Sequence, residues 1–205
     1  MEPPTLFNRL GLSCVLVAFL EKKQVQVGVT YNPTSQELFW AIRGQGAYLE
    51  TPDGTTRRMH SSKCQNIKQA LVALDPGYGR DEASIHRFQS VQKGILQAGV
   101  RNIRAYGCTG LCLANVAPGR LDASFEEGSW EDQTGPKIWD LCAGKLLIEE
   151  AGGVPRGITN QASQTTESMD ALQRSCFVAA TPELADQILD IMYIQRQVVE
   201  GSHPI

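Results

Sequence analysis

The spacing of apolar residues changes part-way along the chain, and this change determines the fold class. In the first third, short apolar runs separated by turn residues predict an antiparallel meander, with strands at 12–20, 25–31, 37–42 and 47–50. From residue 70 onward, strand-like runs alternate with segments of helical spacing, which predict helices at 81–97, 108–117, 140–151 and from residue 182. This order predicts a layered α/β (α+β) fold.

A chain of 205 residues is long enough to bury a real core. We expect one domain over 1–205, with a β-meander part at 1–69 and an alternating α/β part at 70–198. The formal net charge of −3 gives neither a basic surface for nucleic acid nor a polybasic stretch for a membrane. The apolar run at 10–20 is too short to span a bilayer, and we interpret it as a buried strand of a cytoplasmic protein.

Six cysteines are present, but none of their spacings is Cys-x-x-Cys, and the chain has three histidines. Disulfide frameworks belong to short secreted chains, and zinc sites need clustered cysteines and histidines. The sequence therefore favours free thiols that pack as small apolar side chains.

A carboxylate stands where the helix at 140–151 is expected to begin. Asp140 is favoured there by the helix dipole, and for such a residue taken alone a structural N-cap is the plain interpretation. Trp139 is expected to be a core anchor that fixes Asp140 in place. Glu149 and Glu150, near the other end of the helix, are expected on its solvated face.

Four sequence blocks occur in a fixed order and change that interpretation of Asp140. They read Gly-Cys-Thr-Gly at 107–110, Val-Ala-Pro-Gly-Arg-Leu-Asp-Ala-Ser-Phe-Glu at 116–126, Trp-Asp-Leu-Cys-Ala-Gly at 139–144 and Glu-Ala-Gly-Gly at 150–153. Together with the hairpin segments at 28–33 and 43–49, they resemble the inositol monophosphatase family over nearly the whole chain.

The resemblance implies stacked α and β layers (αβαβα in the family), a homodimer, and Mg²⁺-dependent hydrolysis of a small sugar or inositol phosphate. Under it, Asp140 is a metal ligand close to the ester oxygen, and Glu126 binds ring hydroxyls. Cys108 and Thr109 match the loop that touches the sugar. Cys108 departs from the Ser or Thr usual there, and a longer loop at 127–137 could reshape the substrate mouth.

The family's metal motif, Asp-Pro-Ile/Leu-Asp-Gly-Thr-Thr-Asn, does not occur in this sequence, so no catalytic set is complete. We therefore expect an N-terminally truncated member, without the N-terminal helices and the metal-motif segment, and with impaired activity. Asp53-Gly54-Thr55-Thr56 copies part of the motif but is interpreted as a surface turn, and Asp75-Pro76 as the start of a loop. Asp122 is expected to be structural.

Two alternatives remain open at this point. The chain could be a catalytically inactive binding or regulatory module that keeps the sugar pocket. It could also act on another substrate of the same fold, such as a nucleotide bisphosphate or histidinol phosphate, and the loop ending at Trp139 keeps the nucleotide branch open.

Overall fold

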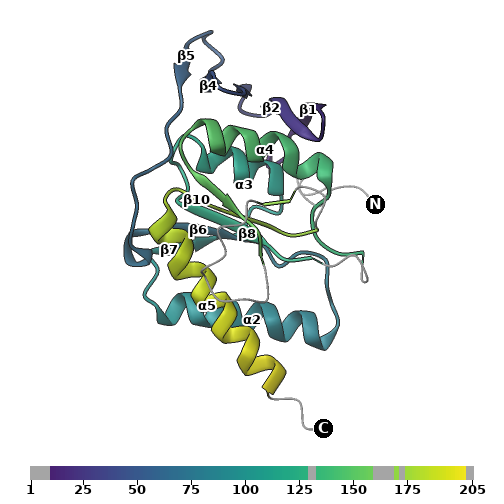
Figure 1. The fold of residues 1–205 in the computed structure, drawn as a ribbon, viewed down its shortest axis with the longest axis vertical. Helices are drawn as coiled ribbons and strands as arrows, with labels where there is room; N and C mark the ends of the chain where they lie inside the picture. The colour runs from purple at the N-terminus through teal and green to yellow at the C-terminus, as the bar shows by residue number, and fades with distance from the viewer. Residues whose placement is uncertain (1–9, 129–132, 159–168, 171–173, 202–205) are drawn as a thin grey trace.

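The computed structural model describes residues 10–128, 133–158, 169–170 and 174–201. In these residues, two five-stranded sheets and four α-helices form stacked layers, and the predicted α/β class is confirmed. In Figure 1 the layers follow one another from the first sheet, through α3 and α4, to the second sheet and then α2 and α5. None of the helices in these residues is long and apolar enough to cross a membrane.

The first sheet is an antiparallel meander in the order β1-β2-β3-β4-β5. Its strands are β1 (Val15–Glu21), β2 (Gln24–Asn32), β3 (Glu37–Ile42), β4 (Gly46–Glu50) and β5 (Thr56–Arg58). Lys22 and Lys23 connect β1 to β2 with φ angles of 48° and 65°. Left-handed backbone at both residues of a two-residue loop matches the twist of the paired strands, so this tight turn fixes their register.

β1 lies at the edge of the first sheet and is not the buried strand that its apolar sequence predicts. Val15, Val17 and Phe19 are 57%, 60% and 60% exposed. They share the outer face of the sheet with their partners on β2, whereas α3 and α4 pack on the inner face. Among the described residues no helix covers this outer face, which explains the failed prediction.

The second sheet has the order β7-β6-β8-β10-β9. Its strands are β6 (Leu71–Leu74), β7 (Asn102–Arg104), β8 (Ala123–Glu126), β9 (Val154–Arg156) and β10 (Cys176–Ala179). β6 runs parallel to β7 and β8, whereas β10 is antiparallel to β8 and β9. The parallel pair matters most for the site, because β6 and β8 end at the same edge of the sheet.

Two helices are sandwiched between the sheets: α3 (Thr109–Val116) and α4 (Ile138–Glu150). Both are apolar around most of their circumference, as the sandwiched position requires. Gly28 of β2 lets α4 approach closely, because a Cβ there would lie 2.9 Å from the carbonyl oxygen of Ala143. The close packing holds the N-termini of both helices against the first sheet.

The other face of the second sheet is covered by α2 (Glu82–Gln97) and α5 (Pro182–Gly201), and η1 (Ile67–Gln69) precedes β6. Asp81 caps α2 by accepting a hydrogen bond from the Ser84 N–H at 2.9 Å. Ile95 is buried, whereas its neighbour Leu96 is 58% exposed, because successive residues on a helix are rotated by about 100°.

Candidate functional site

A cleft of about 610 Å³ opens where β8 ends and where α3 and α4 begin. The residues just before β1 form part of its wall, so the cleft combines both parts of the sequence. All four site residues predicted from the sequence line it, namely Cys108, Thr109, Glu126 and Asp140. Ligand sites are common at such an edge, because side chains at the carboxyl ends of strands meet helix N-termini there.

Glu126 is the last residue of β8 and is only 7% exposed. Thr109 Oγ1 donates a hydrogen bond of 2.5 Å to Glu126 Oε2. The pKa of Glu126 is raised to about 7, chiefly by burial; the Thr109 hydrogen bond lowers the pKa, and the nearby charges of Asp75 and Asp140 add to the increase. Near neutral pH this carboxyl group is therefore poised between its protonated and ionised forms.

Asp140 is the third residue of α4, because the helix begins two residues earlier than expected. Its Oδ2 accepts a hydrogen bond of 2.8 Å from the Lys137 N–H, so one oxygen stabilises the helix start. The half-buried side chain also lines the cleft with Glu126. Asp140 is therefore not the N-cap that the sequence predicted: Lys137 holds that position, and Asp140 closes the capping interaction from the first turn of α4.

The α3 end of the cleft carries two thiols. Cys108 occupies the N-cap position of α3, and its Sγ lies 3.7 Å from Cys14 Sγ, within hydrogen-bond distance for sulfur. The hydrogen bond with Cys14 lowers the pKa of Cys108, although burial raises it. The same hydrogen bond and burial raise the pKa of Cys14.

Asp75, which sequence reasoning assigned only to a loop, holds the segment that leads into the cleft wall. It follows β6 directly, and its carboxylate accepts hydrogen bonds from the Gly107 N–H at 2.9 Å and from Cys112 Sγ at 3.3 Å. These contacts fix the segment that leads into α3. Its position just after a buried parallel strand was the available signal, because such residues face the ligand edge of a sheet.

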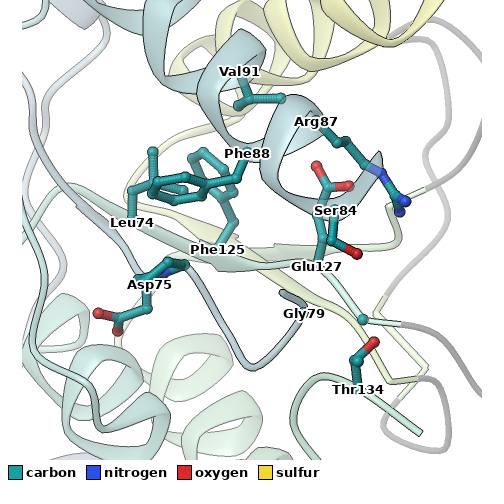
Figure 2. Close-up of a pocket in the computed structure, with 12 residues that line it drawn as sticks. Leu74, Asp75, Gly79, Ser84, Arg87, Phe88, Val91, Phe125, Glu127 and Thr134 are labelled. Carbon is teal, nitrogen blue, oxygen red and sulfur yellow. The ribbon is translucent and has the colours of Figure 1, made fainter. Parts of the chain in front are cut away.

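A small cavity of about 50 Å³, with both apolar and polar residues in its wall, lies beside the cleft, between the second sheet and α2. Leu74, Phe88 and Phe125 supply most of its apolar wall, and Figure 2 shows the Asp75 carboxylate pointing away from these side chains. A cavity of this size has no room for a sugar phosphate, so the larger cleft is the candidate site.

Trp139 is not the core anchor that the sequence predicted. It is 64% exposed at the rim of the cleft, and Lys137 Nζ lies 5.3 Å from its ring centroid. The ring is left outside because α4 begins at Ile138, which turns residue 139 away from the core. Trp139 therefore presents an aromatic surface to anything that enters the cleft.

Glu149 and Glu150 are also misassigned by the sequence, which predicted a solvated face. Glu149 pairs with Arg43 at 3.2 Å and with Lys145. Glu150 accepts hydrogen bonds from the backbone N–H groups of Gly44 and Gly46 at 2.7 and 2.8 Å. Both carboxylates attach the β3–β4 turn to the end of α4, far from the cleft.

Two other polar residues, Asp122 and Asp53, behave as expected. Asp122 accepts hydrogen bonds from Ser62 Oγ and the Leu71 N–H, at 2.5 and 2.7 Å, and so holds the start of β6. Asp53 lies in the β4–β5 turn and accepts from Thr51 and Thr55, which confirms that the motif-like segment is a surface turn.

Residues 8–197 match the sequence profile of the inositol monophosphatase family. The chain belongs to the inositol monophosphatase family. It is 31% identical over 176 residues to the inositol-1-monophosphatase of Caulobacter vibrioides, and 40% identical over 142 residues to inositol monophosphatase 2 of Solanum lycopersicum. These matches cover 83% and 69% of this chain, but 59% and 49% of the relatives. The chain thus spans about half to three fifths of their length.

Solved structures of the family have the same fold. The inositol monophosphatase of Anabaena aligns with a TM-score of 0.74 and 23% identity, covering 92% of this chain and 67% of that one. Mycobacterium tuberculosis SuhB aligns with a TM-score of 0.71 and 24% identity, covering 98% and 70%. At these identities the likeness establishes the fold alone.

The described residues do not make a complete magnesium site. Within residues 10–128, 133–158, 169–170 and 174–201, no three His, Cys, Asp or Glu side chains converge so that they could hold a metal ion. Mg²⁺ requires near-octahedral oxygen coordination, usually with carboxylates and substrate phosphate among its ligands. Asp140 supplies one carboxylate to the cleft, which is too little on its own.

Proposed function

We propose that this chain contributes the polyol-binding part of a phosphomonoester hydrolase that acts on myo-inositol monophosphate or a related sugar phosphate. The observation that supports this is the hydrogen bond from half-buried Thr109 to buried Glu126, in the same cleft as Asp140. The relatives named as inositol monophosphatases support the same substrate class. The cleft volume of about 610 Å³ lies within the range of small-ligand sites.

Three of the site residues, Glu126, Thr109 and Asp140, have distinct tasks in this proposal. Glu126, with a pKa of about 7, accepts a hydrogen bond from a ring hydroxyl when ionised and donates one when protonated. Thr109 holds the Glu126 carboxyl group in a fixed orientation. Asp140 would help hold Mg²⁺ near the ester oxygen, together with carboxylates from outside the described residues. When bound, the metal would activate water and stabilise the leaving oxygen.

We further propose that the polypeptide as given has little phosphatase activity, because too few carboxylates converge on the metal position. The test is Mg²⁺-dependent phosphate release from myo-inositol monophosphate by the purified chain. We expect turnover close to the enzyme-free blank. Turnover near that of a complete relative, such as the Caulobacter protein, would refute the hypothesis.

A chimera tests the assigned residues directly. The N-terminal portion of a relative, including its Asp-Pro-x-Asp-Gly-Thr segment, is joined to this chain and assayed in the same way. We expect activity to return, Asp140→Asn to abolish most of it, and Glu126→Gln mainly to raise KM. Glu82→Gln, an exposed change on α2, is the matched control. An active chimera that tolerates Asp140→Asn would contradict the role given to Asp140.

A binding or regulatory module is the second candidate. It is favoured by a hydroxyl-binding pair in residues that do not themselves complete a metal site. Calorimetry with myo-inositol monophosphate, histidinol phosphate and a nucleotide bisphosphate separates the candidates. Binding of a polyol phosphate without turnover in the chimera would support the binding module. Preferential binding of histidinol phosphate or of the nucleotide bisphosphate would make that ligand the proposed substrate instead.

A cytoplasmic location and a homodimer belong to the same proposal, together with one functional domain built from both parts of the chain. The cleft wall combines residues 13–16 with the α3 and α4 N-termini, which supports one functional unit. Sedimentation of the purified chimera tests the dimer.

A further inference from the structure

Two cysteines far apart in the sequence meet at the wall of the cleft. Cys14 precedes β1 and Cys108 caps α3, and their sulfur atoms are 3.7 Å apart. Both side chains are half-buried and both line the cleft, so a small solute that enters the cleft reaches them. A disulfide needs an S–S distance of about 2.05 Å, so the sulfurs must approach by roughly 1.7 Å.

The helix opposite Cys14 is shaped to receive its thiol. Gly110 lies in the first turn of α3, and a Cβ at that position would stand 2.8 Å from Cys14 Sγ. The missing side chain leaves space for the sulfur beside the helix N-terminus. Cys108 Sγ also lies at the N-terminus of α3, where a hydrogen bond from the Leu111 backbone N–H favours the thiolate form of Cys108.

The other four cysteines differ from this pair in exposure or in partners. Cys112, Cys142 and Cys176 are at most 2% exposed. Cys64 is half-buried like the pair, but its thiol donates to the Asn66 carbonyl oxygen at 3.4 Å. Cys14 and Cys108 therefore combine access from the cleft with a second thiol at short range.

We propose that Cys14 and Cys108 form an oxidisable thiol pair, which a peroxide converts reversibly into a disulfide across the wall of the cleft. The Cys108 thiolate attacks one peroxide oxygen, the O–O bond breaks, and the products are a sulfenic acid on Cys108 and water. Cys14 sulfur then attacks the Cys108 sulfur, the S–O bond breaks, and a second water leaves. The two thiols are oxidised by two electrons, and a dithiol reductant restores them.

This modification site does not depend on the proposed phosphatase function, because it requires only the two thiols and a peroxide. The disulfide would join the segment before β1 to the start of α3, directly beside Thr109.

The test uses the purified full chain. It is treated with hydrogen peroxide, its remaining thiols are blocked with N-ethylmaleimide, and it is digested without reduction for mass spectrometry. We expect a peptide pair linked through Cys14 and Cys108, lighter than the two thiol peptides by about 2 Da, which dithiothreitol removes. The same link should be the first disulfide to form as the peroxide dose rises.

Matched variants complete the test. Cys64→Ser should leave the link unchanged, whereas Cys14→Ser should remove it and leave a Cys108 sulfenic acid that dimedone traps. Gly110→Ala keeps both thiols but displaces Cys14 sulfur, so it should slow the link. A Cys108–Cys112 link, oxidation that begins at Cys64, or sulfinic acid on Cys108 of the unmodified sequence in place of the link would overturn the proposal.

Discussion

At the scale of single residues, one buried carboxyl group, that of Glu126, determines how the charge of the cleft and the stability of the fold depend on pH. Glu126 lies under 10% exposed at the end of β8, and its hydrogen bond from Thr109 only partly offsets the cost of burying a charge. The protonated form is therefore favoured by the folded protein relative to the unfolded chain, and the stability of the fold depends on pH.

Replacing Glu126 by Gln should remove this pH dependence. Because the pKa of Glu126 is about 7 in the folded protein, whereas the ordinary pKa of a glutamate is 4.5, ionisation works against folding. The free energy of unfolding should fall as pH rises from about 4.5 to about 7, by up to about 3 kcal/mol. Urea denaturation at pH 5 and pH 8 measures the difference, which should be small in Glu126→Gln. If the free energy of unfolding changed equally with pH in the variant and in the unmodified sequence, the burial assigned to Glu126 would be contradicted.

Thr109→Val should destabilise the fold above neutral pH by about 1–3 kcal/mol, since ionised Glu126 loses its hydrogen-bond donor while staying buried. It should also raise the pKa of Glu126, because that hydrogen bond lowers it. NMR titration of a Glu-labelled sample checks the pKa. Thr109→Ser keeps the hydroxyl group and should restore both properties, and a failure to do so would point to lost packing of the methyl group.

At the scale of elements, the sequence predicted helices and strands better than it predicted their boundaries and surroundings. The long amphipathic α5 begins at residue 182 as predicted, because the helical repeat is unbroken there. β5 and β9 were missed: both are short, β5 is polar and exposed throughout, and β9 contains Pro155, which disfavours a strand. The four candidate residues that line the cleft were identified through their sequence blocks, whereas the contacts of Asp75 join segments that are distant in sequence and could not be predicted from local pattern.

The β3–β4 turn gives a test at this scale. Glu150 accepts backbone hydrogen bonds from Gly44 and Gly46, so Glu150→Ala should leave two donors without their acceptor. Because the turn is partly solvated, the expected loss is about 1 kcal/mol in the free energy of unfolding. Thermal and urea denaturation measure it. Glu50→Ala, at an exposed position on β4, should have little effect, and an equal loss there would refute the proposed attachment.

At the scale of the whole molecule, the layers are unequally covered. The second sheet has helices on both faces, whereas the outer face of the first sheet presents Val15, Val17 and Phe19 to solvent in the described structure. An apolar edge strand of this kind favours association between chains.

Val17→Thr with Phe19→Thr should therefore reduce concentration-dependent association of the purified chain, at little cost in stability, because both positions are about 60% exposed. Light scattering against concentration measures this. Val178→Thr, at a fully buried position on β10, should instead destabilise the fold and worsen association. Unchanged scattering in the double variant would show that another surface causes the association.

The contact between Cys14 and Cys108 also has a consequence for how the chain assembles. The two sulfurs are separated by 94 positions in sequence, so they meet only after the meander has docked onto α3. Contacts of such long sequence separation form late when loop closure limits the rate of folding. A rapid thiol-bridging reagent can therefore be added at intervals during refolding. The time at which it first links Cys14 to Cys108 would show when this wall of the cleft forms.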